Sequence, residues 1–183
     1  MSLYGLVVYP TDQQAPAWKT WLREHNARLY VYARQRCGSR EDAEDIIQDA
    51  LVRLWGYQKE RGNEPPDLPL AYSVLRFVAM DHSKKHGRKK RKEEAVILLH
   101  DEDDHWLDTN AEDDEEACML REAVQNLGDK LREVVTLKIW GGLTFSQIAE
   151  AMTISPNTAA SRYRYALEQL ERRLERIKNE RYG

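Results

Sequence analysis

The amino-acid sequence predicts an all-α protein: two small helical domains joined by an acidic flexible linker, the C-terminal one a helix-turn-helix. Three observations support this fold class. Apolar residues recur at helical spacing through most of the 183 residues. Glycines and prolines separate these stretches, and no alternating run is long enough for more than a very short strand. An intensely acidic segment divides the chain into two parts.

The distribution of charge defines the expected domains. The whole chain has a net charge of −3, but residues 1–99 carry +4, residues 100–117 carry −10 and residues 118–183 carry +3. Residues 100–117 contain no basic side chain. Because densely spaced like charges repel one another and resist compaction, we expect this segment to be a solvated linker. The domains are therefore expected at 1–99 and 118–183.

Composition excludes several classes of protein. No apolar run approaches the roughly 18–20 residues of a membrane span, and the apolar stretch 3–9 lacks the basic region and cleavage site of a signal peptide. Cys37 and Cys118 lie far apart, without the spacing of a disulfide framework or a zinc site. Two isolated thiols fit a reducing compartment. We expect a cytoplasmic protein with no membrane insertion, cofactor or metal.

Three helices are expected in the first domain. The first covers about Ala17–Arg36 and stops at Gly38. Ser39 is placed to cap the second, with Asp42 at capping-box spacing. The apolar face of this second helix comprises Ala43, Ile46, Ile47, Ala50, Leu51 and Leu54, ending at Trp55, and its opposite face comprises Glu41, Glu44, Asp45, Gln48 and Asp49.

A loop separates the second helix from the third. The segment Gly62–Asp67 cannot continue a helix, because its two prolines lack N–H donors and its glycine adds backbone freedom. The third helix is expected from about Pro69 to His86. Its first half is apolar almost all round, which predicts a central position. Its end is basic, with Lys84, Lys85, Arg88, Lys89, Lys90, Arg91 and Lys92.

The second domain begins with two helices, which end at Gly128 and at Gly141-Gly142. A helix-turn-helix follows. Thr144 and Gln147 have capping-box spacing, and they start a short amphipathic helix. Thr153-Ile154 forms the turn. Ser155 caps the last helix, with Pro156 at its first position, where a missing N–H costs nothing.

The start of the last helix is a candidate DNA-binding surface. Its inward face comprises Ala159, Tyr163, Ala166 and Leu170, and its outward face comprises Asn157, Ala160, Ser161 and Arg164. Short polar groups and arginines at a helix N-terminus suit the major groove of DNA. Arg162 and Arg164 can neutralise phosphates, and the helix dipole also favours an anion. The alternative is an ordinary capped corner between two core helices.

Two segments carry a family resemblance. Residues 42–55 (DAEDIIQDALVRLW) are similar to region 2.2 of bacterial RNA polymerase sigma factors of the extracytoplasmic-function (ECF) type. Residues 142–150 (GLTFSQIAE), followed by Ser155–Thr158 and by Ser161-Arg162, resemble region 4.2. The resemblance covers about residues 20–92 and 118–175, in the family's order. It implies a non-enzymatic sigma factor that directs promoter recognition and transcription initiation.

The resemblance also implies partners and site residues. The implied partners are core RNA polymerase and promoter DNA. An anti-sigma factor is a further partner that the resemblance allows. The implied polymerase-binding residues are Glu41, Asp42, Asp45, Gln48, Asp49, Arg53 and Trp55. The residues implied at the minus-ten element are Tyr72, Arg76, Phe77, Lys84, Lys85 and Arg88, and those at the minus-thirty-five element are Ser155, Asn157, Thr158, Ala160, Ser161, Arg162 and Arg164.

The role of the two aromatic residues stays open at this point, as Tyr72 and Phe77 either stack on an extruded base or belong to the core. The resemblance places one flipped base in the Gly62–Asp67 loop.

Three positions depart from the family. Ala160 replaces a usual lysine, Phe77 a common asparagine and Gly128 a usual proline, so the promoter sequence does not carry over.

Two rival interpretations have some support in the sequence. A stand-alone helix-turn-helix regulator would bind DNA as a dimer, and the stripe Leu167, Leu170, Leu174 and Ile177 offers either a dimer surface or core. An enzyme or metal protein is the second rival, and its metal site would use His100 and His105, which flank Asp101–Asp104. Carboxylates in a flexible segment rarely give a fixed geometry, and no nucleophile or phosphate-loop motif accompanies them.

Overall fold

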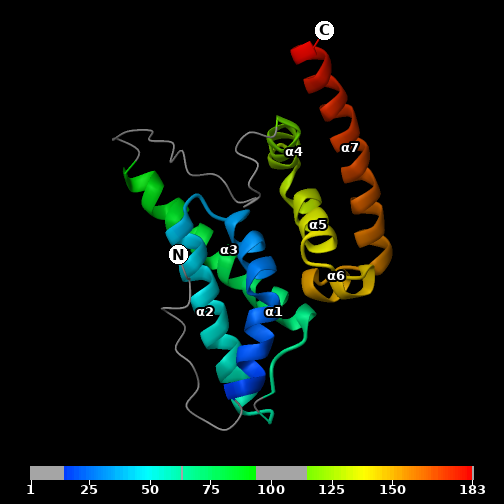
Figure 1. Ribbon diagram of the computed structural model, residues 1–183. Coiled ribbons are helices and arrows are strands. Elements are labelled where there is room, and N and C mark those ends of the chain that lie inside the picture. The colour runs from blue at the N-terminus through cyan, green and yellow to red at the C-terminus, as the bar shows by residue number, and fades with distance from the viewer. Residues whose placement is uncertain (1–14, 63, 94–114, 183) are drawn as a thin grey trace. The chain divides into compact units, whose positions relative to one another are not determined.

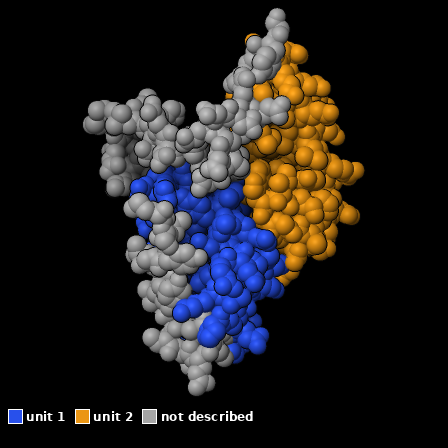
Figure 2. Space-filling model, viewed as in Figure 1, with its two compact units in different colours: residues 1–104 blue, residues 105–183 orange. Residues whose placement is uncertain are grey.

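The structure, a computed structural model, describes residues 15–62, 64–93 and 115–182, with side chains described for 16–62, 64–85 and 119–180. All regular structure in these ranges is helical (Figure 1). The chain divides into two compact units, residues 1–104 and 105–183 (Figure 2). None of the described helices is long and apolar enough to cross a membrane. The helices are α1 (Ala15–Arg34), α2 (Arg40–Lys59), α3 (Leu68–Glu93), α4 (Glu115–Gln125), α5 (Asp129–Ile139), α6 (Phe145–Met152) and α7 (Pro156–Tyr182).

In the first unit, α1, α2 and α3 pack on one another. Aromatic rings occupy the centre of the core. Trp18 of α1 meets Trp55 of α2 edge to face at 5.2 Å between ring centroids, and Tyr32 of α1 meets Tyr72 of α3 at 5.4 Å. Such pairs stabilise a core beyond the burial of their area. All three helices therefore hold their inner faces in one core.

The start of α2 follows the expected cap. Ser39 has extended backbone angles, and its Oγ accepts a hydrogen bond of 3.0 Å from the backbone N of Asp42. This bond satisfies one of the amides that a helix start leaves without a partner. The apolar face is then buried through Ala43, Ile46, Ile47, Ala50 and Leu54.

Several boundaries differ from the expected ones. α3 continues to Glu93, beyond the expected end at His86, because its basic tail consists mostly of good helix formers. α4 begins at Glu115, two residues before the expected end of the linker at residue 117. Residues 100–114 of that linker, including the histidines of the metal alternative, lie outside the described residues.

In the second unit, α7 packs against α4, α5 and α6. The turn after α5 depends on glycine. The backbone N of Gly141 donates to the carbonyl of Thr136 at 2.9 Å, and a Cβ on Gly141 would lie 2.5 Å from the carbonyl oxygen of Leu137. Gly142 has a φ of +70°, which glycine adopts without strain. This turn directs the chain into α6.

The helix-turn-helix has the expected caps. The Thr144 Oγ accepts from the backbone N of Gln147 at 3.2 Å, and the Gln147 side chain accepts from the backbone N of Thr144 at 2.9 Å, which completes a capping box. Thr153 ends α6 in the left-handed conformation. Ser155 then caps α7 by accepting from the backbone N of Thr158 at 3.0 Å.

Candidate nucleic-acid interface and acidic face

One side of α2 is acidic and open to solvent. Glu41, Asp45 and Asp49 are exposed and recur every fourth residue, and Gln48 is half-buried between the last two. We call these four residues the acidic face. Within the described part of the chain, none of the three carboxylates forms an ion pair or hydrogen bond through its side chain. Their charge is therefore available to an external partner.

The other three expected polymerase-binding residues lie apart from the acidic face. Asp42 turns toward α3, where its Oδ1 is 3.5 Å from Nε2 of His82. Trp55 packs its ring on Trp18. Arg53 also reaches toward α3. The structure thus brings together four of the seven residues, and it directs the remaining three toward other helices of the same unit.

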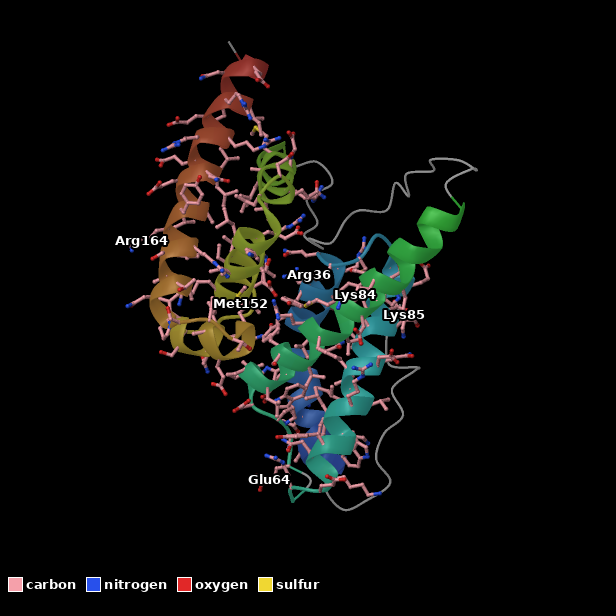
Figure 3. All side chains as sticks on the ribbon, turned by 180° about the vertical axis from the view of Figure 1, so that it is seen from behind. Arg36, Glu64, Lys84, Lys85, Met152 and Arg164 are labelled. Carbon is pink, nitrogen blue, oxygen red and sulfur yellow. The ribbon has the colours of Figure 1, made fainter. Side chains whose placement is uncertain are left out.

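The exposed side of α3 carries apolar and basic side chains together. Phe77 is 56% exposed and Met80 is 41% exposed. Lys84 and Lys85 follow on the same helix, both exposed (Figure 3), whereas Arg76 is half-buried. The side chain of Arg88 lies outside the described residues. An exposed aromatic ring on a helix that also carries exposed lysines is typical of surfaces that bind single-stranded nucleic acid.

Tyr72 does not belong to this exposed side. It is only 1% exposed and packs on Tyr32, so the core interpretation of this residue holds and its DNA-binding assignment was wrong. Burial raises the pKa of the Tyr72 hydroxyl above its usual range. This position faces inward because α1 covers that side of α3. Phe77 lies on the side that α1 leaves open.

The loop before α3 is locally ordered by a cap. Asp67 accepts a 2.9 Å hydrogen bond on its Oδ1 from the backbone N of Leu70. Pro66 and Pro69 are buried, whereas Glu64 is exposed at the loop surface (Figure 3). Gly62 has a φ of +94°, which turns the chain out of α2. The loop therefore exposes Glu64 and Asp67, while the buried Pro66 anchors it to the core.

The first turns of α7 present the expected outward residues. Asn157, Ser161 and Arg164 are exposed, and Thr158, Ala160 and Arg162 are half-buried. In Figure 3, Arg164 points away from α5 and α6, while Met152 lies on the inner side. The opposite side of α7 is held by fully buried Ala159 and Ala166. This arrangement leaves the N-terminal part of α7 free to enter a groove of DNA.

Some polar groups at this surface already have local partners. The hydroxyls of Ser155 and Thr158 lie 2.8 Å apart, and the Ser161 hydroxyl donates to the carbonyl of Asn157 at 2.8 Å. Arg162 and Arg164 have no ion pair or hydrogen bond through their side chains in the described part of the chain. The two arginines therefore carry the charge that a phosphate can use.

The apolar stripe of the long C-terminal helix belongs mainly to the second unit's core. Leu170 and Ile177 are 7% and 6% exposed, and Leu174 is half-buried, whereas Leu167 is 40% exposed. A dimer surface needs a contiguous exposed patch. The stripe therefore does not supply the surface that the stand-alone dimeric regulator required.

Sequence reasoning missed a contact between α2 and α3. Arg53 lies with its guanidinium over the ring of Phe77 and beside Asp81. The spacing of Phe77 and Asp81, one helical turn apart, is readable in the sequence. Their meeting with Arg53 depends on how two helices cross, and no local pattern encodes that.

The fold and its two charged surfaces define a helix-turn-helix protein with a second helical unit that carries an acidic face. Residues 21–89 match the family model of sigma-70 region 2, and residues 119–170 match that of sigma-70 region 4. The chain therefore belongs to the sigma-70 family of RNA polymerase sigma factors. Members of this family are generally non-enzymatic initiation factors that bind DNA.

Similar sigma factors indicate that the chain is of the ECF type. It is 25% identical over 155 residues to the ECF RNA polymerase sigma factor SigL of Mycobacterium tuberculosis, covering 84% of this chain and 86% of that protein. It is 28% identical over 158 residues to the RNA polymerase sigma-E factor of Streptomyces avermitilis, covering 86% and 85%. Both alignments span the two units.

A solved structure supports the fold. The sigma factor RpoE from Bartonella quintana, in complex with the anti-sigma factor NepR, matches with a TM-score of 0.68 and 20% sequence identity. The match covers 86% of this chain and 96% of that one. At this identity the likeness shows the fold, and the residue roles are argued from the surfaces described above.

Proposed function

We propose that the acidic face of α2 docks this sigma factor on core RNA polymerase, while α3 and the start of α7 bind the two elements of a promoter. The observation that carries the docking proposal is the set of exposed carboxylates at Glu41, Asp45 and Asp49, which have no partner in the described residues. Carboxylates held on a rigid helix attract a basic surface and fix its register. The polymerase surface is therefore expected to be basic.

The minus-ten element is assigned to the exposed side of α3. Lys84 and Lys85 neutralise phosphates of the melted strand, and Phe77 stacks on an unpaired base. Capture of an unstacked base favours the open form of the DNA, because only that form makes the contact. This assignment rests on the exposure of Phe77 and on the exposed Lys84 and Lys85 farther along the same helix.

The minus-thirty-five element is assigned to the N-terminal part of α7. Asn157 and Ser161 face base edges, and Arg162 and Arg164 face phosphates. Each contact alone is weak. Core polymerase holds both units at once, so binding at one element raises the effective concentration of the other unit at its own element. The protein acts as a dissociable specificity subunit without catalytic residues, in the cytoplasm where bacterial polymerase works.

An anti-sigma factor is included in the proposal as a further partner. The supporting observation is that the structurally similar RpoE is held in a complex with the anti-sigma factor NepR. A partner that covers the acidic face would compete with polymerase, because both need the same carboxylates. The domain division at 1–99, 100–117 and 118–183 remains a proposal, with α4 beginning within the last residues of the linker.

The docking proposal is tested by capture of core RNA polymerase on the tagged protein. Wild type is expected to retain polymerase, and Asp45→Arg is expected to lose it through charge repulsion. Glu24→Arg is the matched control, because Glu24 is an exposed carboxylate on α1, a different helix from the one that carries the acidic face. Retention by Asp45→Arg at the wild-type level, with an unchanged melting temperature, would refute docking through this face.

A further inference from the structure

Arg53 and Phe77 form a cluster that joins α2 to α3 at the surface of the first unit. The Arg53 guanidinium carbon lies 5.5 Å from the centroid of the Phe77 ring. The Nη2 atom of Arg53 lies 4.0 Å from Oδ2 of Asp81, one helical turn beyond Phe77. One guanidinium therefore contacts an aromatic ring and a carboxylate of the same helix.

Both members of the pair keep much of their surface open. Phe77 is 56% exposed, and the Arg53 side chain is 44% exposed. A cation over a ring is attracted to its face and restricts the movement of both groups. Arg53 has five N–H donors, and Asp81 engages the guanidinium only at the 4.0 Å limit of an ion pair. The cluster thus presents the part of the Phe77 ring that Arg53 leaves open, together with unused N–H donors of Arg53.

We infer that Arg53 and Phe77 together bind one unpaired nucleotide, whose base stacks on the Phe77 ring and whose phosphate pairs with the Arg53 guanidinium. The inference rests on the proposed function of α3 and adds a residue from α2 to it. Stacking on an aromatic ring is independent of base identity, and arginine is well matched to phosphate. A nucleotide offers both groups within one unit of its chain.

The charge of Arg53 argues against its implied place at the polymerase interface. The acidic face is suited to a basic surface, and a guanidinium facing that surface would repel it. Arg53 instead lies against α3, where the nucleic acid is proposed to bind. Asp81 opposes phosphate binding at Arg53, because its carboxylate repels the negatively charged phosphate. Removing that charge is therefore expected to strengthen nucleotide binding.

The test uses the full chain in complex with core RNA polymerase. The probe is a fluorescein-labelled pool of random-sequence single-stranded DNA of 20 nucleotides, and binding is followed by anisotropy. Arg53→Gln and Phe77→Leu are each expected to lower affinity by about five- to tenfold, from the usual strength of cation and stacking contacts. The double variant is expected to lose less than the product of the two, because both residues bind the same nucleotide. Asp81→Asn is expected to raise affinity.

Two controls separate this inference from the proposed function. The affinity of each variant for core polymerase and its melting temperature are measured in parallel, and both are expected to match wild type. If Arg53→Gln weakens polymerase binding but leaves DNA affinity unchanged, Arg53 belongs to the polymerase interface and the inference is wrong. If Phe77→Leu lowers DNA affinity while Arg53→Gln does not, α3 binds the strand without Arg53. If Phe77→Leu and Lys84→Ala also have no effect, α3 is not the DNA surface at all.

Discussion

Thr153 has a backbone conformation that is costly for its residue type. Its φ of 56° and ψ of 52° lie in the left-handed region, where a β-branched side chain is strained. The conformation is imposed by its place in the turn. The backbone N of Thr153 donates to the carbonyls of Ala149 and Glu150, and the backbone N of Ile154 donates to the carbonyl of Ala149 at 2.9 Å. This turn sets the angle between α6 and α7. The strained backbone of Thr153 therefore lies within the helix-turn-helix motif.

Replacing Thr153 with asparagine is expected to raise the free energy of unfolding of the second unit by about 0.5–1 kcal/mol. Asparagine tolerates the left-handed region better than threonine does. Urea denaturation followed by circular dichroism measures the change. Ser146→Asn, at an exposed position within α6, is the control, and it is expected to be neutral or slightly destabilising. A decrease in stability for Thr153→Asn would show that the threonine side chain has a favourable role in the turn.

Cys37 shows how burial controls the chemistry of a single side chain. Its Sγ lies 3.2 Å from the carbonyl oxygen of Ala33 and 3.3 Å from that of Ser39, so the thiol can donate to either one. Burial is the main cause that raises the pKa of this thiol, from 9.0 to about 11. The thiolate is the reactive form of cysteine. Cys37 is therefore an inert structural thiol near neutral pH.

Alkylation of Cys37 by iodoacetamide at pH 8 is expected to be much slower in the folded protein than in urea. Peptide mass spectrometry distinguishes this residue from Cys118. The raised pKa also has a thermodynamic consequence, because the folded state binds the thiol proton more tightly than the unfolded state does. Its contribution to stability is complete below about pH 9 and is lost as the pH rises toward 11. Equal alkylation rates in both states would contradict the raised pKa of this half-buried thiol.

At the scale of elements, α7 combines two tasks along one helix. Its buried side closes the core of the second unit through Ala159, Ala166 and Leu170. Its N-terminal part carries the exposed Arg164 and the half-buried Arg162. Because a helix rises about 1.5 Å per residue, Arg172 lies about 12 Å farther along the axis than Arg164. Only the first turns are therefore placed to contact the DNA that the helix N-terminus approaches.

The double variant Arg162→Ala/Arg164→Ala is expected to weaken DNA binding across sequences and to flatten its salt dependence. The slope of log affinity against log salt is negative, and each lost phosphate contact makes it less steep by about 0.9. A random-sequence duplex titrated at several salt concentrations measures this slope. The matched control is Arg172→Ala/Arg176→Ala, which removes two exposed arginines from the distant part of α7. An equal effect of both variants would mean that binding reflects net charge and not the recognition helix.

At the scale of the whole molecule, charge is divided in a way that suits a protein active only in a larger assembly. The parts before and after the acidic segment are each mildly basic, whereas residues 100–117 carry a net charge of −10. Phosphate repulsion from this segment offsets the attraction of the rest of the chain. Free DNA binding is therefore expected to be weak. In the proposed function, core polymerase supplies the missing affinity by holding both units at their promoter elements.

The caps and the helix-turn-helix could be predicted from sequence because each depends on residues a few positions apart. Ser39, Thr144 with Gln147, and Ser155 before Pro156 act within one helical turn, and all of these positions were predicted. The acidic face could be predicted for the same reason, since its residues share one side of α2 whatever lies against the other side. Helical periodicity is local, and it orders residues around a helix before any neighbour packs against it.

Only the tertiary structure decided which side of α3 faces water. The first half of that helix is apolar almost all round, so periodicity does not distinguish the buried Tyr72 from the exposed Phe77. The crossing of α2 with α3 likewise directs Asp42 to His82 and Arg53 to Phe77, away from the acidic residues beside them in sequence. By itself, the sequence determined the order of the helices, the caps at Ser39, Thr144 and Ser155, and the family resemblance. The exposure of an aromatic residue and the partner of a charge were decided by packing, because they depend on residues that only folding brings together.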